Sequence, residues 1–290
     1  MNNIKILHKD GLEFLADIPD NSVDLVLTDP PYITSRETGM DKWVEHVDKQ
    51  DAEGSSDVKT EEQWLSYKTS EQWSAWFDIG NVAENKRERK LKELKENYIK
   101  YGSIYGKKYA VKTDYGEWDS EFTMEQLELF VSHFYRILRD GGTCIMFFDL
   151  WKLSYLKEQL EGVKFKQLRF IEWIKTNPQP VNSGINYLTN CREMALLGVK
   201  KGKPTFNSKY DKGIYEYPIY GGKDRFHPTQ KSLLLFEELI KKHSNENDIV
   251  LDCFLGSGTT ALAARNTNRK FIGCELDKEF FEKSVNRLEG

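Results

Sequence analysis

The sequence predicts a doubly wound α/β fold, with one mostly parallel sheet covered by helices on both faces. Three observations lead to this prediction. Strand-length apolar runs alternate with helically spaced segments near both ends of the 290-residue chain. Residues that suit ligand binding directly follow two of these runs, and α/β sheets bind ligands at the carboxyl ends of their strands. The chain is also long enough for a large core, and no internal repeat or low-complexity linker divides it. We therefore expect one domain over residues 1–290.

The two ends of the chain contain the clearest strand–helix–strand units. Residues 4–8 alternate like a strand, residues 11–18 have helical spacing, and the apolar run 23–28 predicts a second strand. Near the other end, a glycine-rich turn joins a strand at 249–252 to a helix at 261–265. The same periodicities, with Gly141 and Gly142 as a helix stop, predict the remaining elements: helices 121–139, 151–160, 233–242 and 277–288, and strands 143–148, 165–175, 191–199 and 270–275.

Residues 33–118 interrupt this pattern, and we expect them to form a helical insertion. The segments that start at Thr60 and Ser70 open with a hydroxyl and acidic residues, which is typical of helix starts. A highly charged helix follows at 85–97, and its charge predicts a solvated face. The insertion is a small subdomain packed by its tryptophans, a lid over substrate, or a contact in a homodimer. The basic and aromatic stretch 98–112 also suits nucleic acid, because Lys contacts phosphates and Tyr stacks on bases.

Composition and charge limit the class of protein. Hydrophobic residues make up 39% and charged residues 30% of the chain, and no apolar run approaches the roughly 18 residues of a membrane span. The N-terminus lacks the basic and apolar regions of a signal peptide. Four cysteines without a Cys-x-x-Cys pair argue against structural zinc and suit a cytoplasmic protein. The net charge is −4, yet residues 163–231 hold 13 basic and 5 acidic residues, a segment able to face a polyanion.

The motif Asp-Pro-Pro-Tyr at 29–32 follows the predicted strand 23–28 and forms a stiff polar notch with a flat aromatic wall. Pro30 and Pro31 restrict the backbone, so that Asp29 and the Pro30 carbonyl can accept hydrogen bonds from one planar amino group. Tyr32 would stack on the ring that carries this amine. We interpret the notch as a grip for the exocyclic amine of a nucleic-acid base. An Asp-Pro turn or a helix start is the alternative interpretation.

The turn at 253–260 has the geometry of a nucleoside-binding loop. Gly256 and Gly258 let the backbone approach a ligand, and Glu275 ends the next strand, where an acid accepts hydrogen bonds from ribose hydroxyls. Ala261 replaces the third glycine of the dinucleotide pattern, and no Gly-Lys-Ser/Thr follows as in a Walker loop. The loop alone fits NAD as well as S-adenosylmethionine, and a tight turn without a ligand is also compatible with it.

The notch, the loop and the motif His-Pro-Thr-Gln-Lys at 227–231 together resemble the DNA amino-methyltransferases. The order of the motifs resembles the permuted beta group, in which the catalytic motif precedes the cofactor motif. The resemblance spans residues 4–32 and 116–288. Asp29 is similar to the adenine-specific members, since cytosine-N4 members usually carry Ser there. Cys253 departs from the pattern, because proline is common at this position.

The resemblance implies a Rossmann-like, seven-stranded sheet in permuted order that binds S-adenosylmethionine and requires no metal. It implies methyl transfer to N6 of an adenine flipped out of double-stranded DNA, with Asp29, Pro30, Pro31 and Tyr32 as the catalytic residues. It also implies that three motifs contact the cofactor through the following residues: Asp10, Asp252, Phe254, Gly256, Gly258, Thr259, Glu275, His227, Thr229 and Lys231.

The residue types in the notch suit this chemistry. An aromatic amine is a poor nucleophile because its lone pair is delocalised into the ring. Acceptance of both N–H groups by Asp29 and the Pro30 carbonyl would localise that lone pair and stabilise the positive charge that develops during attack. No Pro-Cys dipeptide occurs, which argues against methylation of cytosine at carbon 5.

Target recognition is expected from residues 177–226. The stretch from 200 to 226 is basic, rich in tyrosine and without periodicity, and we expect an exposed loop or a small excursion from the sheet there. The candidate DNA contacts in this region are Asn177, Lys209, Lys212, Lys223 and Arg225.

Four alternatives to an adenine methyltransferase stay open. One is a DNA-binding module that has lost catalysis, although the intact Asp29, Tyr32 and Glu275 argue against it. A cytosine-N4 methyltransferase and an RNA base amino-methyltransferase would use a similar notch, although the RNA enzymes usually place the cofactor loop before it. A nucleotide-binding oxidoreductase would use the glycine loop and leave the notch unexplained. A homodimer partner and a cognate restriction endonuclease that acts separately are further expectations.

Overall fold

The computed structural model describes residues 3–31, 59–70, 73, 83–102, 104, 122–178, 191–222, 225–227 and 229–289. The chain divides into two compact units. One comprises Met1–Thr34 with Tyr115–Gly290, and the other comprises Ser35–Asp114. The larger unit contains the sheet, so the structure places both ends of the sequence in the same unit.

The larger unit contains the predicted strands and helices, with boundaries that differ by a few residues. Its strands are β1 (Ile4–His8), β2 (Val23–Thr28), β3 (Leu138–Phe148), β4 (Lys166–Lys175), β5 (Arg192–Val199), β6 (Ile214–Tyr217), β7 (Ile249–Asp252) and β8 (Lys270–Glu275). Its helices are α1 (Gly11–Ala16), α7 (Met124–Ile137), α8 (Leu153–Gly162), α9 (Leu233–His243), α10 (Thr259–Asn266) and α11 (Lys278–Glu289), with a 3-10 turn at Leu150–Lys152.

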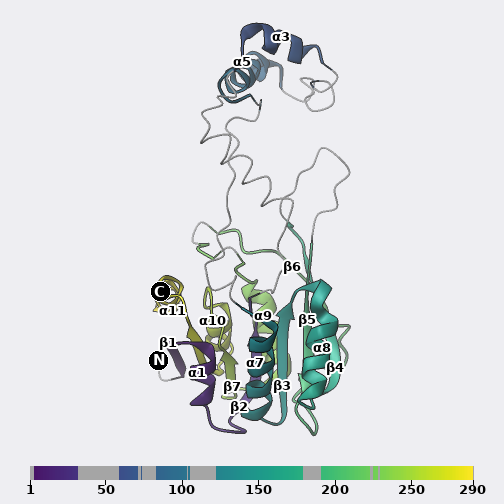
Figure 1. The fold of residues 1–290 in the computed structure, drawn as a ribbon, viewed down its shortest axis with the longest axis vertical. Coiled ribbons are helices and arrows are strands. Elements are labelled where there is room, and N and C mark those ends of the chain that lie inside the picture. Colours follow the sequence, from purple (N-terminus) through teal and green to yellow (C-terminus); the bar gives the residue numbers. More distant parts are fainter. Residues whose placement is uncertain are drawn as a thin grey trace. The chain divides into compact units, whose positions relative to one another are not determined.

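The strands form one sheet in the order β1-β8-β7-β2-β3-β5-β4-β6 (Figure 1). Every neighbouring pair is parallel except the two pairs that β5 makes, with β3 and with β4. Helices α1, α7 and α8 pack on one face, and α9 and α10 pack on the other. The predicted doubly wound, mostly parallel sheet is confirmed, with eight strands in the described residues where we expected seven.

The additional strand is β6, in the stretch where we expected no strand but an exposed loop or a small excursion from the sheet. β6 pairs with β4 in parallel, and the Trp173 indole donates a hydrogen bond of 2.8 Å to the Tyr217 carbonyl. Tyr215 is buried, and its hydroxyl donates to Asp211 at 2.8 Å. The expectation was wrong for residues 214–217 because a four-residue edge strand with one buried side chain is too short to show a period.

Two apolar clusters, one on each face, hold the sheet and its helices together. The first combines α1, α7 and α8 with side chains such as Val26 and Met146, and the second combines α9 and α10 with side chains such as Leu27 and Phe147. Successive strand residues point to opposite faces, so each central strand contributes to both clusters. Cys144, Cys253 and Cys274 are buried, and burial raises the pKa of each thiol. These cysteines therefore behave as small core residues.

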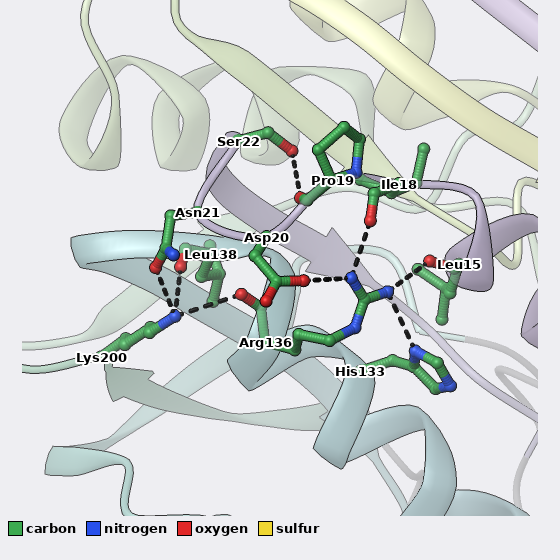
Figure 2. Close-up of polar contacts among 10 residues, drawn as sticks. All are labelled: Leu15, Ile18, Pro19, Asp20, Asn21, Ser22, His133, Arg136, Leu138 and Lys200. Carbon is green, nitrogen blue, oxygen red and sulfur yellow. Dashed lines mark hydrogen bonds and ion pairs between the residues drawn. The ribbon is translucent and has the colours of Figure 1, made fainter.

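A network of polar contacts joins the turn before β2 to the end of α7 and the start of β3, at one edge of the sheet (Figure 2). The Arg136 guanidinium donates to the carbonyls of Leu15 and Ile18 and to the Asp20 carboxylate, at 2.6 to 2.8 Å. The buried Lys200 ammonium donates to the Asn21 side chain at 2.8 Å and to the Leu138 carbonyl at 2.7 Å. These contacts add charged donors to backbone carbonyls at the ends of α1 and α7 and at the start of β3.

We expect Lys200→Met to lower the free energy of unfolding by about 2 to 4 kcal/mol, because buried carbonyls would lose a charged donor. Urea unfolding of both proteins measures the difference. Lys201→Met is the matched control, since the Lys201 side chain is 65% exposed and its nearest carboxylate oxygen is 3.8 Å away. Equal stabilities of the two variants would contradict this role of Lys200.

A buried histidine makes stability depend on pH. His243, in the last turn of α9, packs on Phe206, and burial lowers the pKa of its imidazole to about 4. Between pH 6.5 and pH 4, His243 is therefore protonated in the unfolded chain but neutral in the folded chain. The folded state loses stability relative to the unfolded state as the pH falls through this window. Burial of Asp252 acts in the opposite sense, because it raises the pKa of that carboxyl to about 6.

Comparison with His243→Gln isolates this effect. We expect the variant to be less stable than the wild type at pH 7, and the difference to shrink by about 2 kcal/mol at pH 5. Urea unfolding of both proteins at the two pH values tests the expectation. A difference that does not change with pH would contradict it.

The described part of the smaller unit contains α3 (Glu61–Lys68) and α5 (Glu84–Tyr101). Thr60 caps α3 in a reciprocal arrangement with Gln63, which confirms the helix start predicted there. Trp64 packs on Trp73 and Tyr98, with ring centroids 5.5 and 5.6 Å apart. The charged helix α5 thus contributes Leu94 and Tyr98 to a small apolar cluster with Trp64. The helix expected from Ser70 and most of the stretch 98–112 lie outside the described residues.

Candidate active site

Four carboxylates meet at one edge of the sheet, because they follow the ends of four adjacent strands. β1, β8, β7 and β2 are neighbours and run in parallel, so their carboxyl ends share an edge. Asp10 follows β1, Glu275 ends β8, Asp252 ends β7 and Asp29 follows β2. The structure thus brings together motifs that lie more than 200 residues apart, at the edge where α/β sheets bind ligands.

Asp252 connects the notch strand to the glycine loop. Its carboxylate accepts hydrogen bonds from the hydroxyls of Thr28 and Thr260, both at 2.6 Å, and from the Phe254 amide at 3.1 Å. The side chain is buried, and burial raises its pKa to about 6 against the effect of these donors. The cofactor contact of Asp252 stays a prediction, and the observed hydrogen bonds show that its carboxylate holds the loop to β2 and α10.

Glu275 holds the first turn of the loop. Its carboxylate accepts a hydrogen bond of 2.7 Å from the Gly256 amide and one of 2.9 Å from the Asp277 amide. Gly256 has φ of 51°, and a Cβ there would lie 3.4 Å from the His227 ring. Burial raises the pKa of Glu275, and this carboxylate at the end of β8 is of the type that accepts hydrogen bonds from ribose hydroxyls.

The second glycine and its neighbours complete the loop. Gly258 has φ of 74°, and a Cβ there would lie 3.2 Å from the Ser284 side chain. Thr259 begins α10 and is buried, with its hydroxyl 3.0 Å from the Ser257 hydroxyl. The half-buried Phe254 ring packs on Phe130 with centroids 4.6 Å apart. The backbone, the carboxylates and this ring fit S-adenosylmethionine, whose adenine suits an aromatic wall.

The motif 227–231 joins the cofactor loop to the notch. His227 is buried, packs on Phe280 with centroids 4.4 Å apart and lies 3.1 Å from the Thr229 hydroxyl through Nδ1. Burial lowers the pKa of its imidazole to about 4, so the ring next to Gly256 is neutral at pH 7. At the other end of the motif, the Lys231 ammonium lies 2.7 Å from the Asp29 carboxylate. Lys231 was predicted to contact cofactor, and the structure places it in the notch.

Asp10 caps the first helix of the sheet edge. One of its oxygens accepts hydrogen bonds from the amides of Leu12 and Glu13, at 2.9 and 3.0 Å. Gly11 follows, and a Cβ there would meet the Phe130 ring at 2.8 Å, so this helix packs closely beside the Phe254 wall. The capped position keeps the Asp10 carboxylate at the same sheet edge as Glu275.

The notch itself is described as far as Pro31. Asp29 and Pro31 are half-buried and Pro30 is buried, while Tyr32 lies outside the described residues. Lys231 also binds Glu193 at 2.6 Å, and Glu193 binds Lys175 at 2.6 Å. Two lysines and two carboxylates therefore alternate behind the notch, and the two lysines lower the pKa of Glu193 against its burial.

The predicted DNA contacts do not lie together. Lys209 and Lys212 precede β6 on either side of Asp211, which binds Lys242 in the last turn of α9 at 2.6 Å. α9 ends just before β7 begins, so these lysines lie toward the edge of the sheet opposite the notch. Asn177 and Arg225 lie on the notch side, where Asn177 binds both the amide and the carbonyl of Ile219. Lys223 lies outside the described residues.

The sequence analysis did not identify Glu193 as part of the site. Glu193 lies at the start of β5, which runs antiparallel to β3 and β4, so its first residues reach the same edge as the end of β4. Lys175 ends β4 and stands two residues before Asn177. Charged residues at the ends of two neighbouring apolar strands were the available signal.

The sheet, the glycine loop and the notch are typical of an enzyme that transfers a group from a nucleoside cofactor to an acceptor bound next to that cofactor. The family model for DNA methylases of the N6 and N4 type matches residues 23–286, and the chain belongs to this family. It is thus a DNA methyltransferase, and its methyl donor is S-adenosylmethionine.

Relatives and solved structures agree with this assignment. The type II methyltransferase M2.LlaDCHI of Lactococcus lactis subsp. cremoris is 32% identical over 197 residues, or 61% of this chain and 73% of that protein. M.HpaI of Haemophilus parainfluenzae is 32% identical over 231 residues, or 69% and 71% of the two chains. The crystal structure of an M1.HpyAVI-SAM complex is 25% identical, with a TM-score of 0.57 over 98% of this chain and 99% of that one. The cytosine-N4-specific PvuII methyltransferase, at 16% identity and a TM-score of 0.62, covers 98% of this chain and 86% of its own and supports the fold alone.

Two further findings concern the described residues. Among them, no helix combines the length and the apolar character that crossing a membrane requires. The described part of the chain also contains no cluster of three or more His, Cys, Asp or Glu side chains arranged to hold a metal ion.

Proposed function

We propose that this DNA methyltransferase transfers the methyl group of S-adenosylmethionine to N6 of an adenine in double-stranded DNA, at a specific sequence. The observation that carries the proposal is the position of Asp29. It directly follows β2, at the same edge of the sheet as the glycine loop between β7 and α10, and an ion pair of 2.7 Å with Lys231 holds it. An acceptor for an amine and a seat for the methyl donor therefore lie on adjacent strands.

The residues of the notch supply the catalysis by orientation and charge. The bound cofactor supplies an electrophilic methyl group on its sulfonium. Asp29 and the Pro30 carbonyl accept the two N–H groups of the target amine, which favours a pyramidal nitrogen and stabilises its developing positive charge. Because the amine is inaccessible in a stacked duplex, the base must be flipped out, and Tyr32 is our candidate for stacking on it.

Asp29 favours adenine over cytosine as the target. The matching family covers N6 and N4 methylases, and the notch of this chain begins with Asp, as in the adenine-specific members that the motif resembles. Methylation of cytosine at N4 is the second candidate, because the same notch geometry accepts either exocyclic amine.

Residues on the notch side suit recognition of the DNA. Arg225 is exposed and Asn177 fixes the backbone at Ile219, so these positions are our candidates within the proposed recognition region 177–226. Lys209, Lys212 and Lys223 are weaker candidates, the first two because of their distance from the notch edge. Within the insertion 33–118, the basic and aromatic stretch 98–112 is a candidate contact with DNA, and a contact with a second copy of the chain is the other candidate role of the insertion. A cognate restriction endonuclease is a separate partner in this proposal, and the buried thiols suit a reducing, cytoplasmic compartment.

Incubation with tritiated S-adenosylmethionine and three substrates tests the proposal. The substrates are mixed-sequence duplex DNA, the same DNA as single strands, and transcribed RNA. We expect label in the duplex. Among unlabelled competitor duplexes, we expect only those that contain the target sequence to reduce this label. Label confined to RNA, or the absence of label from all three substrates, would refute the proposal.

A further inference from the structure

Four charged side chains form a connected row behind the notch. The cofactor role expected of Lys231 does not explain this row. In order, it consists of Asp29, Lys231, Glu193 and Lys175, joined by contacts of 2.7, 2.6 and 2.6 Å. The members come from four places: the end of β2, the segment before α9, the start of β5 and the end of β4. The row therefore connects the notch across the sheet to the strand that precedes the proposed recognition region.

Lys231 is buried, the other three side chains are half-buried, and the two cations balance the two anions. The Lys231 side chain is 7% exposed, and the other three are between 15% and 19% exposed. The Lys231 ammonium lies above the Phe147 ring, 5.5 Å from its centroid, so an apolar residue forms the floor beneath it. A buried ammonium is stable only when carboxylates compensate its charge, and here two carboxylates do so.

We propose that Lys231 is a positioning residue that holds the Asp29 carboxylate in orientation for the target amine, with Glu193 and Lys175 as its support. The proposal rests on the proposed function of the notch. Lys231 binds Oδ2 of Asp29, which fixes the plane of the carboxylate and keeps it an acceptor. Lys231 is compensated by two carboxylates, and a third anion, the carboxylate of a cofactor, would have to compete with them.

Glu193 has a distinct part in this arrangement. A lysine that paired with Asp29 alone would oppose the positive charge that develops on the amine. Glu193 binds the same Lys231 ammonium and also binds Lys175. The Lys231 ammonium therefore orients the Asp29 carboxylate without neutralising its charge. This explains why the row contains four members rather than a simple ion pair.

The test compares Lys231→Met, Lys231→Arg and Glu193→Gln, with Lys241→Met as the matched control. Lys241 is an exposed lysine in the last turn of α9, away from the notch. For each protein we would measure the single-turnover rate of methyl transfer to duplex DNA at saturating cofactor, and the Kd for S-adenosylmethionine by calorimetry. We expect Lys231→Met to lower the rate about 10- to 100-fold, as for other residues that orient a ligand, with the Kd changed less than about threefold.

The conservative variants separate positioning from mere structural support. We expect Lys231→Arg to recover at least about tenfold of the lost rate, because it retains a charged donor. Glu193→Gln should lower the rate about tenfold, with an unchanged Kd and with a melting temperature close to that of the control. If Lys231→Met does not fold, these two variants decide the question by the same criteria.

Two results would overturn the inference. One is a large rise in Kd for Lys231→Met with an unchanged rate at saturation, which would make Lys231 a cofactor ligand. The other is wild-type rates in both Lys231→Met and Glu193→Gln. Failure of the proposed function is distinguishable, because in that case the wild-type protein itself transfers no methyl group to duplex DNA.

Discussion

Asp29→Ala is expected to lower the rate of methyl transfer by more than about 10³-fold while the Kd for S-adenosylmethionine stays close to that of the wild type. The substitution removes an oriented acceptor from the developing charge, and one such group is worth about 10²- to 10³-fold. It also leaves the notch without the anion that Lys231 binds at 2.7 Å. Single-turnover assays with saturating duplex and cofactor measure the rate, and calorimetry measures the Kd.

Asp29→Asn is the matched variant for this prediction. It retains the shape and one acceptor oxygen but not the charge, so we expect a rate between those of Asp29→Ala and the wild type. Glu246→Ala, in the exposed turn between α9 and β7, serves as a control for the loss of a carboxylate. Turnover by Asp29→Ala that is close to wild type would show that the notch does not bind the amine.

Glu275→Ala is expected to weaken the binding of S-adenosylmethionine about 100-fold. Glu275 accepts hydrogen bonds from the amides of Gly256 and Asp277, at 2.7 and 2.9 Å, and therefore shapes the loop that seats the cofactor. Hydrogen bonds to a charged group contribute about 1.5 to 3 kcal/mol each, and the loss of two readily accounts for a factor of this size. Calorimetric titration of the DNA-free protein measures the change.

Glu275→Gln and Glu279→Ala are the comparisons for this prediction. Glu275→Gln keeps one acceptor for the loop amides, so we expect a smaller loss of affinity. Glu279 lies in the first turn of α11 and is exposed, and its replacement should leave the Kd unchanged. An unchanged Kd for Glu275→Ala would reject the role of this carboxylate in seating the cofactor.

The fold was predictable because its signals are local. Strands such as β2 and β7 are short apolar runs that end in a carboxylate or a notch, and the loop at Gly256 and Gly258 requires the positive φ that glycine adopts easily. The boundary between α7 and β3 was harder to predict. α7 ends at Ile137 and β3 begins at Leu138, five residues before the strand that the apolar run alone indicates.

The parts of the site that were not predicted depend on contacts between distant residues. Lys231 was assigned to the cofactor by its motif, and its pairing with Asp29 follows only once β2 and the segment before α9 are placed side by side. The only local signal for Glu193 is its place at the start of an apolar strand, and a single acid there usually lies in solvent. Asp252 was recognised as important, but the hydrogen bond that it accepts from Thr28 depends on the pairing of β2 with β7.

The notch is proposed to direct the methyl group to N6 of adenine, and the proposed function depends on this role. The most direct measurement uses methyl-deuterated S-adenosylmethionine and mixed-sequence duplex DNA, with mass spectrometry of the nucleosides after digestion. Wild-type protein and Asp29→Ala are assayed side by side. We predict deuterated N6-methyldeoxyadenosine with the wild type and none above background with Asp29→Ala. Deuterated methyl groups on N4 or carbon 5 of cytosine, or the same amount of labelled adenine with both proteins, would contradict the account.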